Sequence, residues 1–401
     1  MIKLSTQLHI RNSKIACEDG TIIEGEMLVE NGVITKISRS PIKDVKGESL
    51  DAQGCLALPG FIDIHVHGAE GADFMDGTDL AFETISSALS KEGTTSFLAT
   101  TLTQSDNDIV QTIATGRRFM QKHMPKAEML GIHLEGPFIH VEQAGAQPRE
   151  FIRKPSTDLV ERWFADGFDI LKVVTLAPEL DEQYALTSFL AEKAVIVSAG
   201  HTKATCGDIQ QAIQKGLTHL THFGNAMTGL HHREIGVVGA GFLFDQLTCE
   251  VIADGVHTST EMLQLLFKTM GSERIVLITD SMRAKGLTDG EYTLGGQEVA
   301  VQGIKATLKD GTLAGSVLRM DNALRNMFEV TSCSVQDLVN MTSANAAKRL
   351  GVFERKGSLA VGKDADIVLL DHDLQVHMTI CRGAIGYRQD VACTASTMEG
   401  K

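Results

Sequence analysis

The sequence contains no long apolar run and no closely spaced pair of cysteines. Nowhere does an apolar stretch approach the ~20 residues that span a bilayer, and residues 1–20 include none of signal-peptide length. The cysteines, seven in all, are Cys17, Cys55, Cys206, Cys249, Cys333, Cys381 and Cys393. Without a Cys-x-x-Cys motif, they favour reduced thiols over a disulfide framework or a thiolate zinc site. We expect each cysteine to be a small buried residue. For the protein as a whole we expect a cytoplasmic location and no membrane partner.

Positive charge is also scarce. Lys and Arg number 37 against 51 Asp and Glu, a net charge of −14, whereas phosphate backbones need a dense basic surface. Nucleic acid is therefore not an expected partner, although a single arginine in a pocket can still hold a small phosphate. The composition, 43% hydrophobic and 22% charged, is that of an ordinary globular protein. Its 401 residues exceed what one core usually organises, so we expect one large and one smaller domain.

The two ends of the chain carry similar β-strand patterns. Short segments near the N-terminus alternate apolar and polar residues between Asp-Gly and Asn-Gly turns: Gln7–Ile10, Gly25–Val29 and Val33–Ile37. We interpret them as antiparallel strands. Near the C-terminus, a turn-rich stretch leads into Ile367–Leu370 and a further extended segment to Ile380. Residues 1–57 and 356–401 are therefore predicted to form one small β-sandwich domain together.

Strand and helix patterns alternate through residues 58–355. The apolar or β-branched runs are Phe61–Val66, Thr94–Thr101, Met129–Leu134, Ile170–Leu176, Val195–Ala199, His219–Phe223, Leu247–Ile252 and Ile275–Thr279. Segments with a helical period follow most of them: Leu80–Lys91, Asp108–Lys122, Thr157–Ala165, Glu182–Lys193, Cys206–Lys215, Glu261–Met270 and Asp321–Val330. Eight such repeats favour a (β/α)8 TIM-like barrel, an α/β fold. A doubly wound open sheet is the alternative, weakened because no Gly-x-Gly-x-x-Gly turn follows the first strand.

An insertion at residues 285–315 interrupts this alternation after the eighth strand. It is rich in glycine and turn-forming aspartate and includes several short β-like runs. In a barrel, the position after the eighth strand lies over the top, where barrel enzymes keep their active sites. The insertion is thus either a lid or pocket wall, or a solvent-exposed hairpin with no part in the site.

Side chains that bind metals fall at the ends of the predicted strands. They are His65 and His67 on the first strand, Glu135 on the third, His201 on the fifth, His222 on the sixth and Asp280 on the eighth. The C-terminal ends of barrel strands point into one shared mouth, where so many imidazoles and carboxylates would lack partners without a cation among them. The His-x-His spacing also puts both rings on one face of the strand. We therefore predict a divalent-metal site, with His133, deeper on the strand of Glu135, in a structural or supporting role.

Several motifs around these residues occur in order along the chain. They are Leu58-Pro-Gly-Phe-Ile-Asp-Ile-His-Val-His67, Gly131-Ile-His-Leu-Glu-Gly-Pro-Phe138, Ser198-Ala-Gly-His201, Thr221-His-Phe-Gly-Asn-Ala-Met227 and Ile278-Thr-Asp-Ser-Met282. Leu230-His-His-Arg-Glu234 and Ala253-Asp-Gly-Val-His257 add to the series. With these motifs, residues 58–362 resemble the amidohydrolase superfamily and, within it, the N-acetylglucosamine-6-phosphate deacetylase family.

The resemblance implies a role for each metal-binding residue. Glu135, His201 and His222 would hold the main divalent metal. His65 and His67 would join Glu135 around a second metal, although some members of the family lack this histidine pair and work with one. Zinc or iron is the expected metal, and manganese or cobalt also suits such ligands.

The same resemblance implies the substrate and its contacts. The expected reaction is hydrolysis of N-acetyl-D-glucosamine 6-phosphate to D-glucosamine 6-phosphate and acetate, in amino-sugar catabolism. Asp280 would act as general acid and base toward a metal-activated water. The residues that would bind the sugar phosphate are Gln147, Asn225, Ala226, Arg233, His257 and Leu313. Gln147 replaces a histidine that many members carry, and the implied homodimer would let Arg233 reach a neighbour's pocket.

Three alternatives stay open at this point. The N-acetylgalactosamine-6-phosphate deacetylases resemble this family closely, so the sugar epimer is undecided. A cyclic-amide hydrolase would need a carboxylated lysine at the end of the fourth strand, whereas Lys172 stands near its beginning. A non-catalytic sugar-phosphate binding protein would be expected to have lost Asp280 or a metal ligand, and none is missing. The chain has no Gly-x-Ser-x-Gly elbow that would point to a serine nucleophile.

Overall fold

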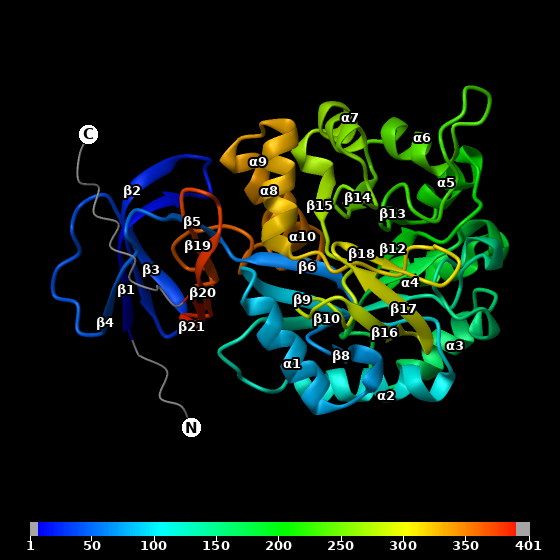
Figure 1. Cartoon of the computed structure of the whole chain (residues 1–401), viewed down its shortest axis with the longest axis horizontal. Helices are drawn as coiled ribbons and strands as arrows, with labels where there is room; N and C mark the ends of the chain where they lie inside the picture. Colours follow the sequence, from blue (N-terminus) through cyan, green and yellow to red (C-terminus); the bar gives the residue numbers. More distant parts are fainter. Residues whose placement is uncertain (1–6, 390–401) are drawn as a thin grey trace.

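The computed structural model describes residues 7–389, which form a small body and a larger one (Figure 1). The small body, on the left of Figure 1, is a sheet made from both ends of the chain. The larger body is a barrel of alternating strands and helices. Parts of the two predicted end segments, residues 1–6 and 390–401 with Cys393, lie outside the described residues.

The sheet of the small body contains eight strands. They are β1 (Gln7–Ala16), β2 (Ile22–Glu30), β3 (Val33–Ser38), β4 (Glu48–Asp51), β5 (Leu56–Pro59), β19 (Ile367–Leu370), β20 (Val376–Cys381) and β21 (Ala384–Arg388). β1, β2 and β3 pair antiparallel, which confirms the predicted N-terminal arrangement. β4 and β5, which the sequence analysis did not predict, run parallel to β1. β19 pairs with β5, so residues from both chain ends share one core that includes Ile10, Met27 and Ile380.

Eight parallel strands form the barrel in chain order. They are β6 (Phe61–Val66), β9 (Thr94–Thr100), β10 (Glu128–Glu135), β11 (Leu171–Leu176), β12 (Ile196–Ala199), β13 (Leu217–Leu220), β14 (Thr248–Val251) and β15 (Ile275–Leu277). The first and last strands meet where the N–H of Asp280 donates to the carbonyl of His65 at 2.8 Å. Asp63 strengthens this closure by accepting hydrogen bonds from the backbone and hydroxyl of Thr279. The predicted (β/α)8 barrel is confirmed.

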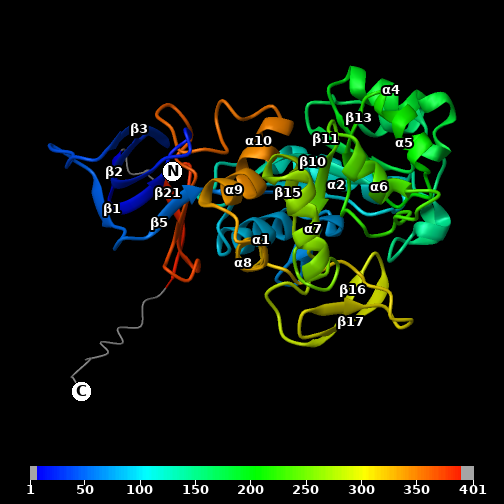
Figure 2. The ribbon, with the colours of Figure 1, turned by 90° about the horizontal axis from the view of Figure 1, so that it is seen from above.

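Helices follow the strands and cover the outside of the barrel (Figures 1 and 2). They are α1 (Asp79–Ser90), α2 (Asp106–Phe119), α3 (Thr157–Trp163), α4 (Ala185–Glu192), α5 (Cys206–Ile213), α6 (Gly236–Leu243), α7 (Thr260–Met270), α8 (Met320–Thr331), α9 (Val335–Val339) and α10 (Asn345–Arg349). Ser or Thr side chains cap several of them, as Thr78 does for α1 and Ser105 for α2. The sequence analysis missed α6, because its glycine-rich segment is apolar on every side and so shows no helical period.

A three-stranded antiparallel sheet from the insertion lies over one end of the barrel (Figures 1 and 2). Its strands are β16 (Gly290–Leu294), β17 (Gln297–Gln302) and β18 (Lys305–Thr307), and a short hairpin of β7 (Gly68–Ala69) and β8 (Ala72–Asp73) follows the first barrel strand. Apolar residues of the sheet share a small core with Leu102 and Ala146 of the barrel loops. Leu294 and Leu313 also line the cavity described below, so the insertion contributes part of its wall.

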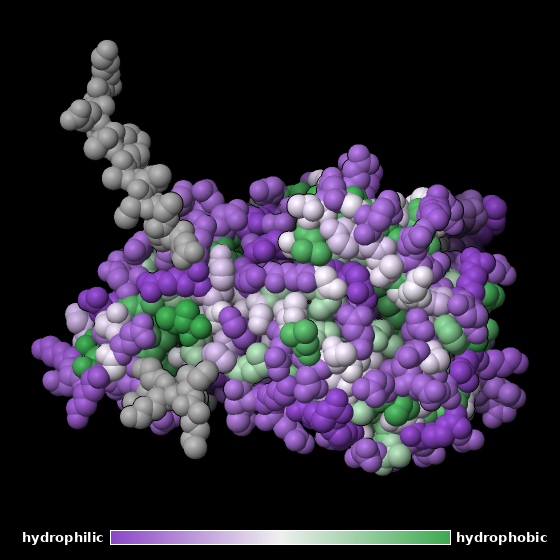
Figure 3. Space-filling model, turned by 60° about the horizontal axis from the view of Figure 1, so that its bottom comes forward, coloured by the Kyte–Doolittle hydropathy of each residue, from purple (hydrophilic) through white to green (hydrophobic). Residues whose placement is uncertain are grey.

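The face seen in Figure 3 is hydrophilic over most of its area, with hydrophobic residues in small, separate groups. Within residues 7–389 no helix combines the length and the apolar character that a membrane crossing requires. None of the six cysteines in this range forms a disulfide. Cys17 and Cys206 are half-buried rather than buried as predicted, because one follows the end of β1 and the other begins α5.

Candidate active site

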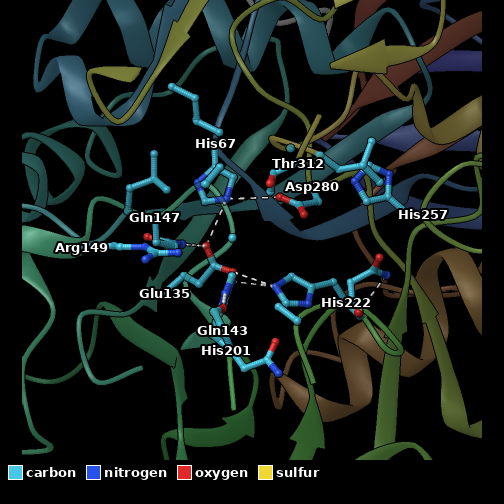
Figure 4. Close-up of a pocket in the computed structure, with 18 of the residues that line it drawn as sticks. His67, Glu135, Gln143, Gln147, Arg149, His201, His222, His257, Asp280 and Thr312 are labelled. Atoms are coloured by element: carbon cyan, nitrogen blue, oxygen red, sulfur yellow. Dashed lines mark hydrogen bonds and ion pairs between the residues drawn. The ribbon is translucent and has the colours of Figure 1, made fainter. Parts of the chain in front are cut away.

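The predicted metal-binding residues come together at the C-terminal ends of the barrel strands (Figure 4). His65 belongs to β6, His67 follows that strand directly, and Glu135 ends β10. The other three lie on loops just past their strands, namely His201, His222 and Asp280. β13 already ends at Leu220, so the predicted extension of this strand through His222 is wrong.

Those three loop residues adopt a left-handed backbone conformation. Their φ values are 48° at His201, 30° at His222 and 47° at Asp280. Such values cost a residue other than glycine of order 1–3 kcal/mol, and a strand cannot continue through them. Backbone hydrogen bonds hold them in place; the carbonyl of Asp280, for example, accepts from the N–H of Ser316 at 2.8 Å. The strained backbone turns these side chains into the shared cavity.

One group of donor atoms surrounds an oxygen of Glu135. Its Oε1 lies 3.2 Å from Nε2 of His201 and 3.1 Å from Nε2 of His222. The two Nε2 atoms are themselves 3.0 Å apart. His201 donates its Nδ1 proton to the carbonyl of Gln143 at 2.7 Å, so its Nε2 carries an inward lone pair. Lone pairs this close repel one another unless a proton or a cation lies between them.

A second group of donor atoms lies on the other side of Glu135. Nε2 of His67 is 3.3 Å from Oε2 of Glu135 and 3.3 Å from Oδ1 of Asp280. Nε2 of His65 is 3.5 Å from Oε1 of Glu135 and 3.5 Å from Oδ1 of Asp280. Because each of its oxygens faces donor atoms, Glu135 could contribute a ligand to a metal held by either group.

Both groups fit a divalent metal by the chemistry of their donors. All of their side chains are buried, and their atoms lie about as far apart as ligands ~2.1 Å from a common ion. Imidazole with carboxylate suits zinc, iron, manganese and cobalt. His133 also lies close to His65 but offers no free donor atom, because its Nδ1 donates to the carbonyl of Ile64 and its Nε2 bonds the hydroxyl of Thr175.

The charges of the site shift its protonation equilibria strongly. Burial alone would raise the pKa of Asp280, but His65 and His67 outweigh it and hold the pKa at about 2. Burial alone would lower the pKa of His67, but hydrogen bonds to Asp280 and Glu135 raise it to about 9. Asp280 is therefore a carboxylate at neutral pH and able to accept a proton. Protons compete with a metal ion for His67.

The donor groups open into a cavity of about 410 Å³, within the range of small-molecule sites. The predicted substrate-binding residues that line it are Gln147, Asn225, Ala226, His257 and Leu313. The side-chain amide of Gln147 donates to Oε2 of Glu135 at 2.6 Å and accepts from the N–H of Thr103 at 2.7 Å. Gln147 thereby orients Glu135, a contact that the sequence left undetermined.

Arg233 is the predicted site residue that the structure does not bring to the cavity. It lies in an exposed stretch, residues 229–234, and its guanidinium donates to His232 at 2.7 Å. Among the cavity-lining residues of the described chain, Arg149 alone carries a permanent positive charge. His257 is a second group that can carry positive charge. Burial lowers the pKa of His257, but its hydrogen bond to Asp254 at 2.7 Å outweighs burial and raises it.

The sequence analysis did not single out Glu250 or Arg149. Glu250, on β14, is fully buried and accepts a hydrogen bond from Nδ1 of His65 at 3.0 Å. A signal for it was present, because a carboxylate inside the apolar run Leu247–Ile252 is seldom buried without a specific partner. Nothing in the sequence distinguishes Arg149 from other arginines in polar loops.

Comparisons with known proteins agree with this site. Residues 56–386 match the amidohydrolase family. The N-acetylglucosamine-6-phosphate deacetylase of Bacillus subtilis (strain 168) is 45% identical over 388 residues, which cover 96% of this chain and 98% of that protein. The N-acetylgalactosamine-6-phosphate deacetylase of Escherichia coli O157:H7 is 36% identical over 376 residues, 94% of this chain and 98% of that one. The crystal structure of N-acetylglucosamine-6-phosphate deacetylase from Thermotoga maritima superposes with a TM-score of 0.85 at 36% identity, covering 95% of this chain and 100% of the other.

Proposed function

This chain belongs to the amidohydrolase family, and we propose that it hydrolyses N-acetyl-D-glucosamine 6-phosphate to D-glucosamine 6-phosphate and acetate, in amino-sugar catabolism. The observation that carries the proposal is the pair of donor groups around Glu135 with the ionised Asp280 beside them. The relative with 45% identity over almost the whole chain supports the glucosamine substrate.

The chemistry must overcome two weaknesses of an acetamide, a poorly electrophilic carbonyl and a poor leaving group. A divalent metal held by the donor groups would supply the polarisation of the carbonyl and lower the pKa of a water toward ~7. Asp280 accepts a proton at Oδ1 during the attack and delivers it to the departing nitrogen. Oδ1 lies 3.3 Å from Nε2 of His67, at the edge of the donor groups, which suits this exchange.

We propose two divalent metals per chain, with zinc or iron expected. One would be held by His201 and His222 and the other by His65 and His67, with Glu135 shared between them. Elemental analysis of protein prepared without chelators should give close to two metals per chain. A ratio near one that does not rise when metal is added would remove the second site from the proposal.

The sugar phosphate is proposed to bind against the wall that carries Asn225, Ala226 and His257. The hydrogen bond to Asp254 favours the protonated form of His257, and a protonated His257 would suit a phosphate group because charge-assisted hydrogen bonds are the strong ones. Arg233 lies outside the cavity of its own chain, so it would contribute from the neighbouring subunit of a homodimer. Arg149, which lines the cavity, is the alternative phosphate-binding residue within the chain itself.

The described residues also support the proposed location and argue against two rival functions. The six cysteines without disulfide partners support a cytoplasmic location. A cyclic-amide hydrolase is disfavoured because Lys172 is only the second residue of β11, away from the strand ends that carry the site. A non-catalytic binding protein is disfavoured because every donor and Asp280 are in place.

An acetate-release assay tests the proposal. N-acetylglucosamine 6-phosphate, N-acetylgalactosamine 6-phosphate and unphosphorylated N-acetylglucosamine are compared, each with and without added zinc, iron, manganese or cobalt. We expect the first substrate to be hydrolysed fastest and the unphosphorylated sugar poorly. A preference for the galactosamine epimer would reassign the substrate. No acetate from either phosphate, with metal analysis showing a loaded protein, would refute the function.

A further inference from the structure

We infer that Glu250 is a positioning residue for the second donor group: its carboxylate fixes the tautomer of His65 and so sets how tightly that group holds a metal. The inference rests on the two-metal centre proposed above. Glu250 reaches His65 from β14, a strand that carries none of the six predicted metal-binding residues.

The first argument is the hydrogen bond itself. Oε2 of Glu250 lies 3.0 Å from Nδ1 of His65, and neither side chain has any exposed surface. Because the carboxylate oxygen accepts, Nδ1 of His65 carries a proton, and in the neutral ring that can bind a metal Nε2 carries the lone pair. That lone pair points toward Glu135 and Asp280, each 3.5 Å away. The opposite tautomer would place a proton where a metal ligand is needed.

Second, one oxygen of Glu250 is left without a partner in the described part of the chain. This oxygen, Oε1, is buried and accepts no hydrogen bond there. The neighbouring His133 does not compensate, because both of its nitrogens are bonded to Ile64 and Thr175. A buried carboxylate left this way is costly unless positive charge lies near. A cation bound at Nε2 of His65 would lie across the imidazole ring from Glu250 and would compensate the buried carboxylate.

The third argument is a contrast among the four ligand histidines. Nδ1 of His201 donates to a neutral backbone carbonyl, whereas Nδ1 of His67 and of His222 has no hydrogen-bond partner among residues 7–389. His65 alone has a carboxylate behind it. A carboxylate partner raises the basicity of the imidazole more than a carbonyl does. The metal affinity of the second group should therefore depend on Glu250, and that of the first group should not.

Two variants separate the charge from the hydrogen bond. Glu250→Gln keeps an oxygen that can accept from Nδ1 and removes the charge, whereas Glu250→Leu removes both. Zinc affinity of the full chain is measured at each site by competition with a chelator, together with metal content. We expect Glu250→Leu to weaken the second zinc about 10- to 100-fold, the usual effect of losing such a partner. Glu250→Gln should weaken it less, and the first zinc should be unchanged in both.

Glu92→Gln is the matched control. Glu92 is also a buried carboxylate, 1% exposed, but it pairs with Lys285 outside the site. This variant should lower Tm and keep both zinc affinities. If Glu250→Leu does not fold, Glu250→Gln decides alone, and wild-type affinity for the second zinc in that variant overturns the inference.

Two results would overturn the inference: wild-type affinity for the second zinc in both Glu250 variants, or equal weakening of both zincs. A wild-type protein that binds a single zinc would overturn it as well. Failure of the proposed function is read separately, from acetate release by the wild type, because the zinc titrations need no substrate.

Discussion

Replacement of Asp280 by asparagine tests the proposed chemistry at a single atom. Asparagine fills the same space but cannot exchange a proton near neutral pH. It also tolerates the left-handed φ of 47° at this position better than most residues do. The backbone hydrogen bonds from Asp280 to His65 and from Ser316 to Asp280 do not involve the side chain, so they should survive. Asp280→Asn should therefore fold like the wild type.

The expected loss follows from the position of the carboxylate. General acid–base catalysis is typically worth 10²- to 10⁴-fold, or ~2.7–5.4 kcal/mol at 1.36 kcal/mol per tenfold. We expect kcat of Asp280→Asn to fall by about that factor, with KM changed much less. The metal held by the first donor group should stay, because Asp280 faces His65 and His67 rather than His201 and His222.

The assay measures kcat, KM and metal content on one preparation of Asp280→Asn. Asp310→Asn is the control, since this carboxylate lines the same cavity but belongs to neither donor group, and its kcat should change little. If excess metal restores the activity of Asp280→Asn, the residue is a ligand and not the proton carrier. A variant that keeps its metal and its full kcat would remove Asp280 from the mechanism altogether.

Three further predictions concern the phosphate, the metal and pH. Arg233→Ala should raise KM for the phosphorylated sugar about 10- to 150-fold, which corresponds to the loss of a charge-assisted contact of ~1.5–3 kcal/mol. Arg149→Ala should change KM little. If steady-state kinetics show the larger rise in KM for Arg149→Ala, the phosphate binds to Arg149 instead. Dialysis against a chelator should abolish acetate release and lower Tm, because the ion stabilises only the folded chain; activity that persists in metal-free protein would contradict this. Burial would raise the pKa of Glu128, but Lys356 and the arginines beside it hold the pKa at about 2, below its ordinary 4.5. The stabilising contribution of Glu128 is thus complete above pH 4.5 and is lost as the pH falls toward 2. The free energy of unfolding should therefore drop less steeply between pH 4.5 and 2 in Glu128→Gln than in the wild type. Identical pH curves for the two proteins would refute the assignment.

Apolar patterning was sufficient to predict the barrel, because strands buried on both faces form short continuous apolar runs. β6 begins and ends at the predicted Phe61 and Val66. The same signal failed in two informative places. α6 is apolar on all sides and is a helix because of its burial rather than its period. β13 stops at Leu220 because the φ of His222 breaks the strand, although the buried Phe223 follows directly.

The residues that come together at the site could be predicted from the sequence, whereas what orients them could not. Residue type and position at a strand end are local properties, and they were enough to select His65, Glu135 and Asp280. The direction of Asp280 depends on the N–H of Ser316, which comes from beyond the insertion. The tautomer of His65 depends on Glu250, 185 residues away along the chain. The candidate metal site therefore has two parts. In the first, local part, the metal-binding side chains can be recognised from residue type and position at a strand end. In the second, long-range part, residues far away along the chain decide which atoms of those side chains can bind. Substitutions in the second part should change metal affinity while every ligand remains in place.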